Sequence, residues 1–99
     1  MATYWLSFRL ENDATYALRY DALVETIRQQ TTKWWPETTA FFVFESGRTI
    51  DQIAESVAEV IDERCDVVLC GMTDFKSARL IGNNQDNDIF DLIPFIKKV

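Results

Sequence analysis

Four consecutive apolar residues, Phe41 to Phe44, lie within the segment TTAFFVFESG. Successive side chains of a strand point to opposite faces, so a strand with one face in water alternates apolar and polar residues. This segment is apolar at every step, and we predict a strand over 39–45 whose two faces are both covered. A chain of 99 residues forms one small core. The cover of the second face is therefore the main constraint on the fold.

The other segments place this strand in an α+β order. Residues 3–10 alternate between apolar and polar side chains, which predicts a half-buried strand. Apolar residues recur at helical spacing in 16–30 and again from Ile50 onward, and Thr49 with Gln52 forms the sequence signature of a capping box. The further predicted strands are 65–72, 78–82 and a short edge strand or hairpin arm around Trp34, Trp35 and Pro36.

Two amphipathic helices cannot bury their apolar stripes on each other and also leave four apolar strands in water. We therefore predict a ferredoxin-like α+β sandwich, with a four- to five-stranded, mainly antiparallel sheet and two helices on one face. Residues 1–99 are predicted to form a single domain. Residues 84–99 are its docked C-terminal tail, because they are rich in apolar side chains and begin as a helical turn that Pro94 interrupts.

In such a fold the sheet face away from the helices is bare. A contiguous apolar patch of that kind usually marks an interface, so we expect a second copy of the chain to cover it through two-fold symmetry. The expected dimer contacts are Trp5, Phe41, Val43, Leu80 and Ile81. The alternative is that the tail folds back over the sheet and covers this face itself.

The composition limits the chemistry and the partners. Sixteen Asp and Glu against ten Lys and Arg give a net charge of −6, which does not favour binding to nucleic acid or to an anionic membrane. There is no histidine, the usual general base and metal ligand. Cys65 and Cys70 are expected to be reduced and packed, so we expect no metal and no cofactor. The first ten residues lack a signal-peptide pattern and no apolar run approaches the length of a membrane span, so we expect a cytoplasmic protein without a membrane partner.

Within this element order, the segments YALRYDALVETI, TTAFFVFESG and RLIGN resemble small bacterial proteins of the SinR family. Over residues 3–83 the pattern is more distantly similar to the second CRISPR-associated protein and to virulence-associated protein D. The resemblance implies a ferredoxin-like homodimer whose sheets pack together, with a late strand that often pairs across the dimer. For the CRISPR-associated relatives it also implies a metal-dependent nuclease, or a structural role in binding duplex DNA.

The chain departs from these relatives at the end of the first strand. The nucleases have an aromatic–Asp–aliphatic triplet there, and the two-fold pair of aspartates holds the metal. The matching triplet is FRL, with Arg9 in the place of the aspartate, and a cation there opposes binding of a divalent metal. A divergent nuclease would have to use Glu11 or Asp13 instead. The other interpretation of LENDA is a turn whose acid favours the N-terminus of the next helix.

Cations and tryptophans could also form a nucleic-acid footprint. Arg9 and Arg79 would contact phosphates, and Trp34 and Trp35 would offer stacking surfaces. In a strand, one of the two adjacent rings enters the core while the other points outward. The alternative is ordinary hydrophobic packing with solvated charge.

These observations predict a non-enzymatic homodimer that acts through its surface as an interaction module. Its first partner is a second copy of itself, and a further protein partner is possible. Two other functions stay open. One is a divergent metal-dependent nuclease acting on RNA or DNA, and the other is an acidic protein that binds a basic partner.

Overall fold

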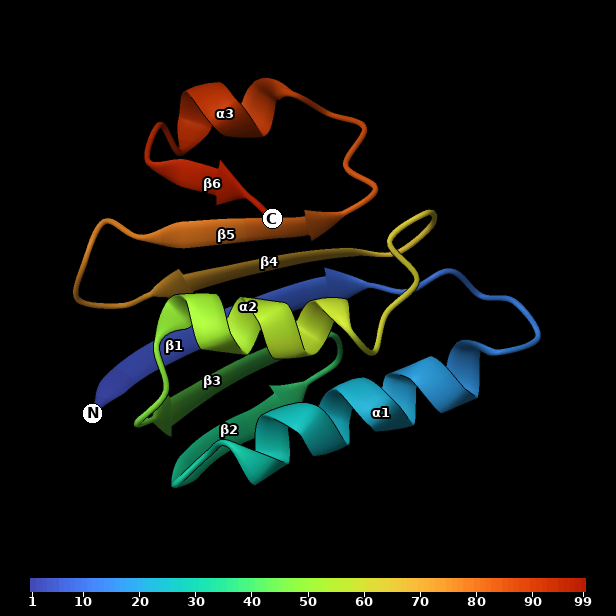
Figure 1. Cartoon of the computed structure of the whole chain (residues 1–99), viewed down its shortest axis with the longest axis horizontal. Coiled ribbons are helices and arrows are strands. Elements are labelled where there is room, and N and C mark those ends of the chain that lie inside the picture. The colour runs from blue at the N-terminus through green and yellow to red at the C-terminus, as the bar shows by residue number, and fades with distance from the viewer.

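The computed structural model describes residues 1–99 and contains one six-stranded sheet and three helices (Figure 1). The elements are β1 (Ala2–Arg9), α1 (Tyr16–Gln29), β2 (Lys33–Thr38), β3 (Phe41–Ser46), α2 (Ile50–Ala58), β4 (Val67–Met72), β5 (Ala78–Gly82), α3 (Asp88–Leu92) and β6 (Ile96–Lys98). None of the helices is long and apolar enough to cross a membrane. The predicted α+β class is confirmed.

The strands lie in the order β2-β3-β1-β4-β5-β6, and every neighbouring pair is antiparallel except β5 with β6, which is parallel. The sheet thus has more strands than the four or five that the sequence predicts. The additional strand, β6, comes from the tail. Its three residues, IKK, are too short to show the alternation by which a strand is recognised.

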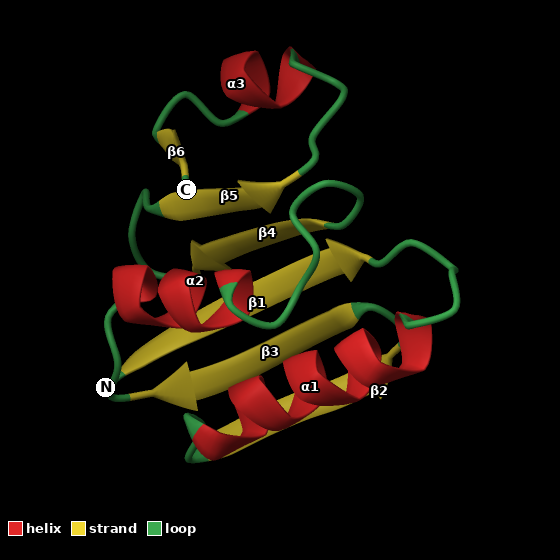
Figure 2. Ribbon diagram, turned by 45° about the vertical axis from the view of Figure 1, so that its right-hand side comes forward, coloured by secondary structure: helices red, strands yellow, loops and turns green.

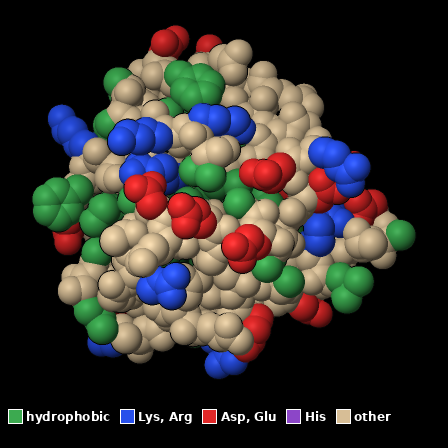
Figure 3. Space-filling view, in the orientation of Figure 1, with side chains coloured by type: hydrophobic (Ala, Val, Ile, Leu, Met, Phe, Trp, Pro, Cys, Tyr) green, Lys and Arg blue, Asp and Glu red, His purple; other side chains and the backbone are tan.

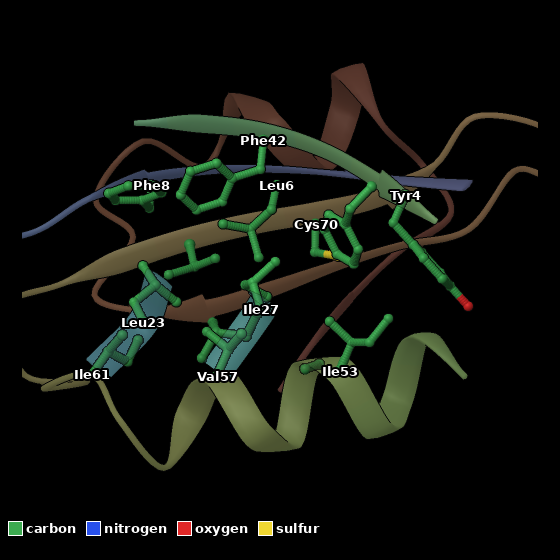
Figure 4. Close-up of a cluster of buried hydrophobic side chains, with 14 of the residues drawn as sticks. Tyr4, Leu6, Phe8, Leu23, Ile27, Phe42, Ile53, Val57, Ile61 and Cys70 are labelled. Carbon is green, nitrogen blue, oxygen red and sulfur yellow. The ribbon is translucent and has the colours of Figure 1, made fainter. Parts of the chain in front are cut away.

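Figures 1 and 2 show α1 and α2 side by side on one face of the sheet, as predicted. Tyr4, Leu6 and Phe8 of β1 point from this face into a core of 16 buried residues. Figure 4 shows how these side chains meet Leu23 and Ile27 of α1 and the apolar side of α2. The alternation of β1 and the helical spacing of both helices therefore place the core where the sequence predicts it.

The start of α2 is fixed by the capping box. The backbone N–H of Gln52 donates to Thr49 Oγ1 at 3.1 Å, and the backbone N–H of Thr49 donates to Gln52 Oε1 at 2.9 Å. Two N–H groups at the helix start are thus satisfied reciprocally, as the sequence predicts.

Both edges of the sheet discourage the addition of another strand. β2 contains Pro36 and its pairing with β3 shifts register between Trp35 and Thr38. At the other edge, β6 is only three residues long and two of them are lysines. Short, charged or irregular edges of this kind oppose edge-to-edge pairing. Contacts with other molecules are therefore more readily made through a face of the sheet than through its edges.

Candidate interaction surface

The sheet face away from α1 and α2, called here the far face, carries an apolar row across three strands. Trp35 of β2 is paired with Val43 of β3, and Val43 is paired with Trp5 of β1. Trp35 is 45% exposed, and Val43 and Trp5 are partly exposed. Phe41 lies one step along on the same face and is also partly exposed. We call these four residues the open row.

Trp5 extends over the neighbouring strand, and a glycine makes this possible. Trp5 is paired with Gly71 of β4. A Cβ atom at Gly71 would lie 2.4 Å from Trp5 Cζ2, so no other residue fits beneath the indole in this position. The indole is thereby packed against the backbone of β4, and the open row ends at this strand.

Beyond β4, the chain covers its own far face. Leu69 and Leu80 are paired across β4 and β5 and point to this face, but Leu80 is only 2% exposed. Ile89 and Leu92 of α3 line one groove together with these two leucines. The tail is held beside β5 by the parallel pairing of β6 and by the backbone N–H of Val99, which donates to the Leu80 carbonyl at 2.9 Å.

These positions divide the predicted dimer contacts. Trp5, Phe41 and Val43 lie on the open part of the far face. Leu80 lies beneath the tail, and Ile81 points to the helix-covered face, where it is fully buried. The expectation that Leu80 and Ile81 contact a partner is therefore wrong. The sequence interpretation did not determine which of two adjacent apolar residues faces which side, nor that the tail lies over β5.

The predicted nucleic-acid footprint is not brought together. Arg79 is 8% exposed, and its Nε donates to Asp51 Oδ1 at 2.6 Å at the start of α2. Trp34 packs its ring against Phe42, with centroids 5.5 Å apart, on the opposite side of the sheet from Trp35. Of the four residues predicted to form this footprint, only Arg9 is an exposed cation. Arg79 and Trp34 lie on the helix-covered side of the sheet, so they do not share a surface with Arg9 and Trp35.

Charges of both signs are interspersed over the helix-covered face (Figure 3). The exposed carboxylates of Asp51 and Glu55 on α2, and of Glu59 just after it, lie among them, and Asp51 is paired with Arg79. The hydrogen bond from Arg79 lowers the pKa of Asp51. The face has no patch of a single charge that would select a basic or an acidic partner.

Glu11 and Asp13, the alternative metal ligands, follow β1 and are exposed. Asp13 Oδ1 accepts from the Thr15 backbone N–H at 3.0 Å and from Arg19 Nη1 at 2.9 Å. Hydrogen bonding to Arg19 lowers the pKa of Asp13. Nowhere do three or more Asp, Glu or Cys side chains gather in a way that could hold a metal ion. Asp13 thus forms part of the turn that starts α1.

The arginine that binds Asp13 also binds a fully buried carboxylate, Asp66. Arg19 Nε donates to Asp66 Oδ2 at 2.8 Å, and the backbone N–H groups of Glu11 and Asp62 donate to the two Asp66 oxygens at 2.8 Å each. Burial raises the pKa of Asp66, but these hydrogen bonds outweigh it, so the pKa lies below its usual value. Asp66 therefore ties the end of β1, α1 and the start of β4 together.

The sequence interpretation missed Asp66 because a charged residue is placed at the surface by default. A weak signal was present, since Asp66 directly precedes the apolar run VVLC and lies at the boundary of a strand.

The two cysteines are free, and burial raises the pKa of the Cys70 thiol to about 12. A thiol with this pKa is not a nucleophile near neutral pH.

The comparisons with known proteins give no relative: no protein family, no curated protein and no solved structure matches the chain.

Proposed function

We propose that the protein is a cytoplasmic, non-enzymatic homodimer with a ferredoxin-like fold, and that it acts as an interaction module of the SinR or CRISPR-associated type. The open row of Trp5, Phe41, Val43 and Trp35 is the proposed contact between the two copies. The observation that carries the proposal is that these four side chains lie together on a sheet face that the chain's own tail leaves uncovered. Contiguous exposed apolar patches usually mark interaction sites.

The connectivity supports the ferredoxin-like part of the proposal. The first six elements run β1-α1-β2-β3-α2-β4, and their strands form an antiparallel sheet in the order β2-β3-β1-β4 with both helices on one face. The split βαβ fold has the same element and strand order, which supports the ferredoxin-like part of the proposal. β5, β6 and α3 are then additions at the β4 edge. The cytoplasmic location is supported by the two cysteines, which are both free.

Light scattering after size-exclusion chromatography tests the proposal, with the wild-type chain measured over a range of concentrations. We expect a dimer that dissociates on dilution. Val43→Glu places a charge in the centre of the open row, and we expect it to give a monomer because an unpaired charge is costly to bury. The matched control is Leu18→Glu, since Leu18 is 72% exposed on α1, away from the far face.

We expect Leu18→Glu to associate like the wild type. Circular dichroism of all three proteins shows whether they remain folded. A wild-type chain that is monomeric at every concentration contradicts the proposal, as does a folded Val43→Glu variant that dimerises with unchanged affinity.

A further inference from the structure

Two opposite charges lie at one end of the open row. Lys33 of β2 and Glu45 of β3 are paired directly across the two strands. They lie two residues along from Trp35 and Val43 respectively, so their side chains also point to the far face. Lys33 is exposed and Glu45 is partly exposed. The open row is thus bordered by a cation and an anion at the same level of the sheet.

These two charges are not paired within the chain. The five ion pairs of the chain include neither residue. One carboxylate oxygen of Glu45 accepts from Thr32 Oγ1 at 3.0 Å, which leaves the other oxygen without a partner. A two-fold rotation can bring the cation of one copy onto the anion of the other and repeat the contact on the other side of the axis. The pattern is therefore self-complementary.

The direction of the two-fold axis decides whether these charges meet. An axis between two facing sheets lies in the plane of contact, and Val43 is at the centre of the open row. If the axis ran across the strands through Val43, Lys33 and Glu45 would face the level of the partner's Phe41, which lies equally far from the axis on the other side. Both charges would then be unpaired against an apolar side chain, and an unpaired charge is costly to bury.

An axis that runs along β3 gives the opposite result. It exchanges β2 and β1, which are the two neighbours of β3, and it keeps each level of the sheet facing the same level of the partner. Trp35 then lies over the partner's Trp5, since both residues are at the level of Val43. The charged level of one copy likewise faces the charged level of the other.

The twist of the sheets decides which charges meet at this level. Packed sheets cross at about −30° because each sheet is twisted, so the axis is inclined by about 15° to the strands. In the view of Figure 1, a crossing of this sign turns the partner's β3, which lies behind the sheet, anticlockwise, and so moves its Glu45 toward β2. Glu45 is about 6.6 Å from Val43 along the strand, so the shift is about 3 Å of the about 4.8 Å between strands. The partner's Glu45 therefore approaches Lys33 rather than Glu45 of the first copy.

We infer that the two copies of the proposed dimer pack β3 against β3 about an axis that passes Val43 and runs nearly along the strands, and that Lys33 of each copy forms an ion pair with Glu45 of its partner. This inference rests on the proposed function. The partner's β4 and β5 then lie outside the β2 edge, because the partner's β1 is already opposite β2. The part of the far face that α3 covers is thus left out of the contact.

Sedimentation velocity of Lys33→Glu, Glu45→Lys and their equimolar mixture tests the inference. Each variant alone has like charges at both contacts, and we expect it to dimerise about tenfold more weakly or worse. In the mixture, one chain carries two carboxylates and the other two ammonium groups, so the heterodimer has opposite charges at both contacts and association returns to the wild-type level. The two positions are also neighbours within each chain, but that repulsion is the same in the single and mixed samples. Recovery therefore reports only on contacts between copies.

The matched controls are Lys76→Glu and Glu63→Lys, which make the same changes in net charge at exposed sites in the β4–β5 turn and in the loop between α2 and β4. We expect neither control to alter the dimer, and circular dichroism shows that each variant is folded. If the wild type dimerises but neither reversal at Lys33 or Glu45 weakens it, or if the mixture fails to recover, this geometry is wrong and the proposed homodimer stands. If the wild type is monomeric, the proposed function itself fails. Equal weakening by the controls would show that only net charge matters and would also overturn the inference.

Discussion

The two halves of the far face differ in how their apolar side chains are covered. Over β4 and β5, the chain places α3 against the sheet, with β6 paired beside β5, and Leu80 is almost fully buried. Over β2, β3 and β1, nothing from the chain covers Val43 and Trp35. Both halves have apolar side chains at paired positions, so the strand sequences alone do not distinguish them. The difference lies in the tail, which reaches one half and not the other.

This difference separates stability from association. A side chain under the tail contributes its burial to the folded monomer, whereas a side chain in the open row contributes most of its burial only when a partner arrives. Substitutions under the tail should therefore lower the stability of the monomer, and substitutions in the open row should weaken the dimer.

Asp66→Asn should lower the stability of the whole fold. Asp66 lies in neither half of the far face, and its hydrogen bonds link elements on which both halves depend. The substitution leaves Arg19 without its buried counter-charge, and we expect a loss of about 3–5 kcal/mol in the free energy of unfolding. Chemical denaturation followed by circular dichroism measures it. Asp62→Asn is the control, since Asp62 is paired with Arg64, whose side chain is 90% exposed, and we expect a much smaller loss. Equal losses of unfolding free energy in the two variants would show that the hydrogen bonds of Asp66 stabilise the fold no more than an exposed ion pair does.

Acid should reproduce the Asp66 effect in the wild type. The folded-state pKa values of Asp66, Asp13 and Asp51 lie below the usual value of about 3.9. These carboxylates therefore contribute stability above that pH, and the contribution is lost as the pH falls from about 4 through the lowered pKa values. Urea denaturation across this range should show a steep loss in the wild type and a shallower one in Asp66→Asn. Parallel pH profiles for the wild type and Asp66→Asn would show that Asp66 does not cause the loss of stability in acid.

Leu80→Ala and Val43→Ala compare the two halves directly. Leu80 is buried under the tail, so we expect its loss to cost about 2–4 kcal/mol of unfolding free energy. Val43 is partly exposed in the monomer, so its loss should cost about 1 kcal/mol or less and weaken dimerisation instead. Denaturation measured at a concentration where the chain is monomeric, together with sedimentation velocity, separates the two effects. The comparison fails if Val43→Ala proves the more destabilising of the two in the monomer.

Gly71→Ala tests the boundary between the halves, with the smallest expected effect. The added Cβ displaces the Trp5 indole from its position over β4. Because the indole is partly exposed it can move, and we expect a loss of about 1 kcal/mol. The indole N–H resonance of Trp5 should shift, whereas that of Trp34 on the other side of the sheet should not. An unchanged Trp5 resonance would show that the ring does not rest on Gly71.

Much of the helix-covered side could be predicted from the sequence, because periodicity reports directly on one buried face. The alternation of β1 and the capping box of α2 are local patterns, and both are confirmed. The far face could not be predicted in the same way. Whether Leu80 is covered depends on where residues far along the chain dock, and β6 is too short to show a strand pattern.

The charged residues show the same limit. Arg79 and Asp66 are buried because each finds a partner distant in sequence, Asp51 and Arg19 respectively. A sequence pattern records the charge of a residue but not the presence of such a partner, so the burial of neither residue could be predicted. Their burial removes Arg79 from the predicted nucleic-acid footprint and identifies Asp66 as a structural residue.

Isotope-filtered NMR on an equimolar mixture of labelled and unlabelled chains tests the division of the far face most directly, because it detects only contacts between copies. We predict intermolecular NOEs from the methyl groups of Val43 and from the indoles of Trp5 and Trp35, and none from the methyl groups of Ile81, which is fully buried on the helix-covered face. Intermolecular NOEs confined to α1 and α2, or none at a concentration where all resonances are resolved, would contradict the account.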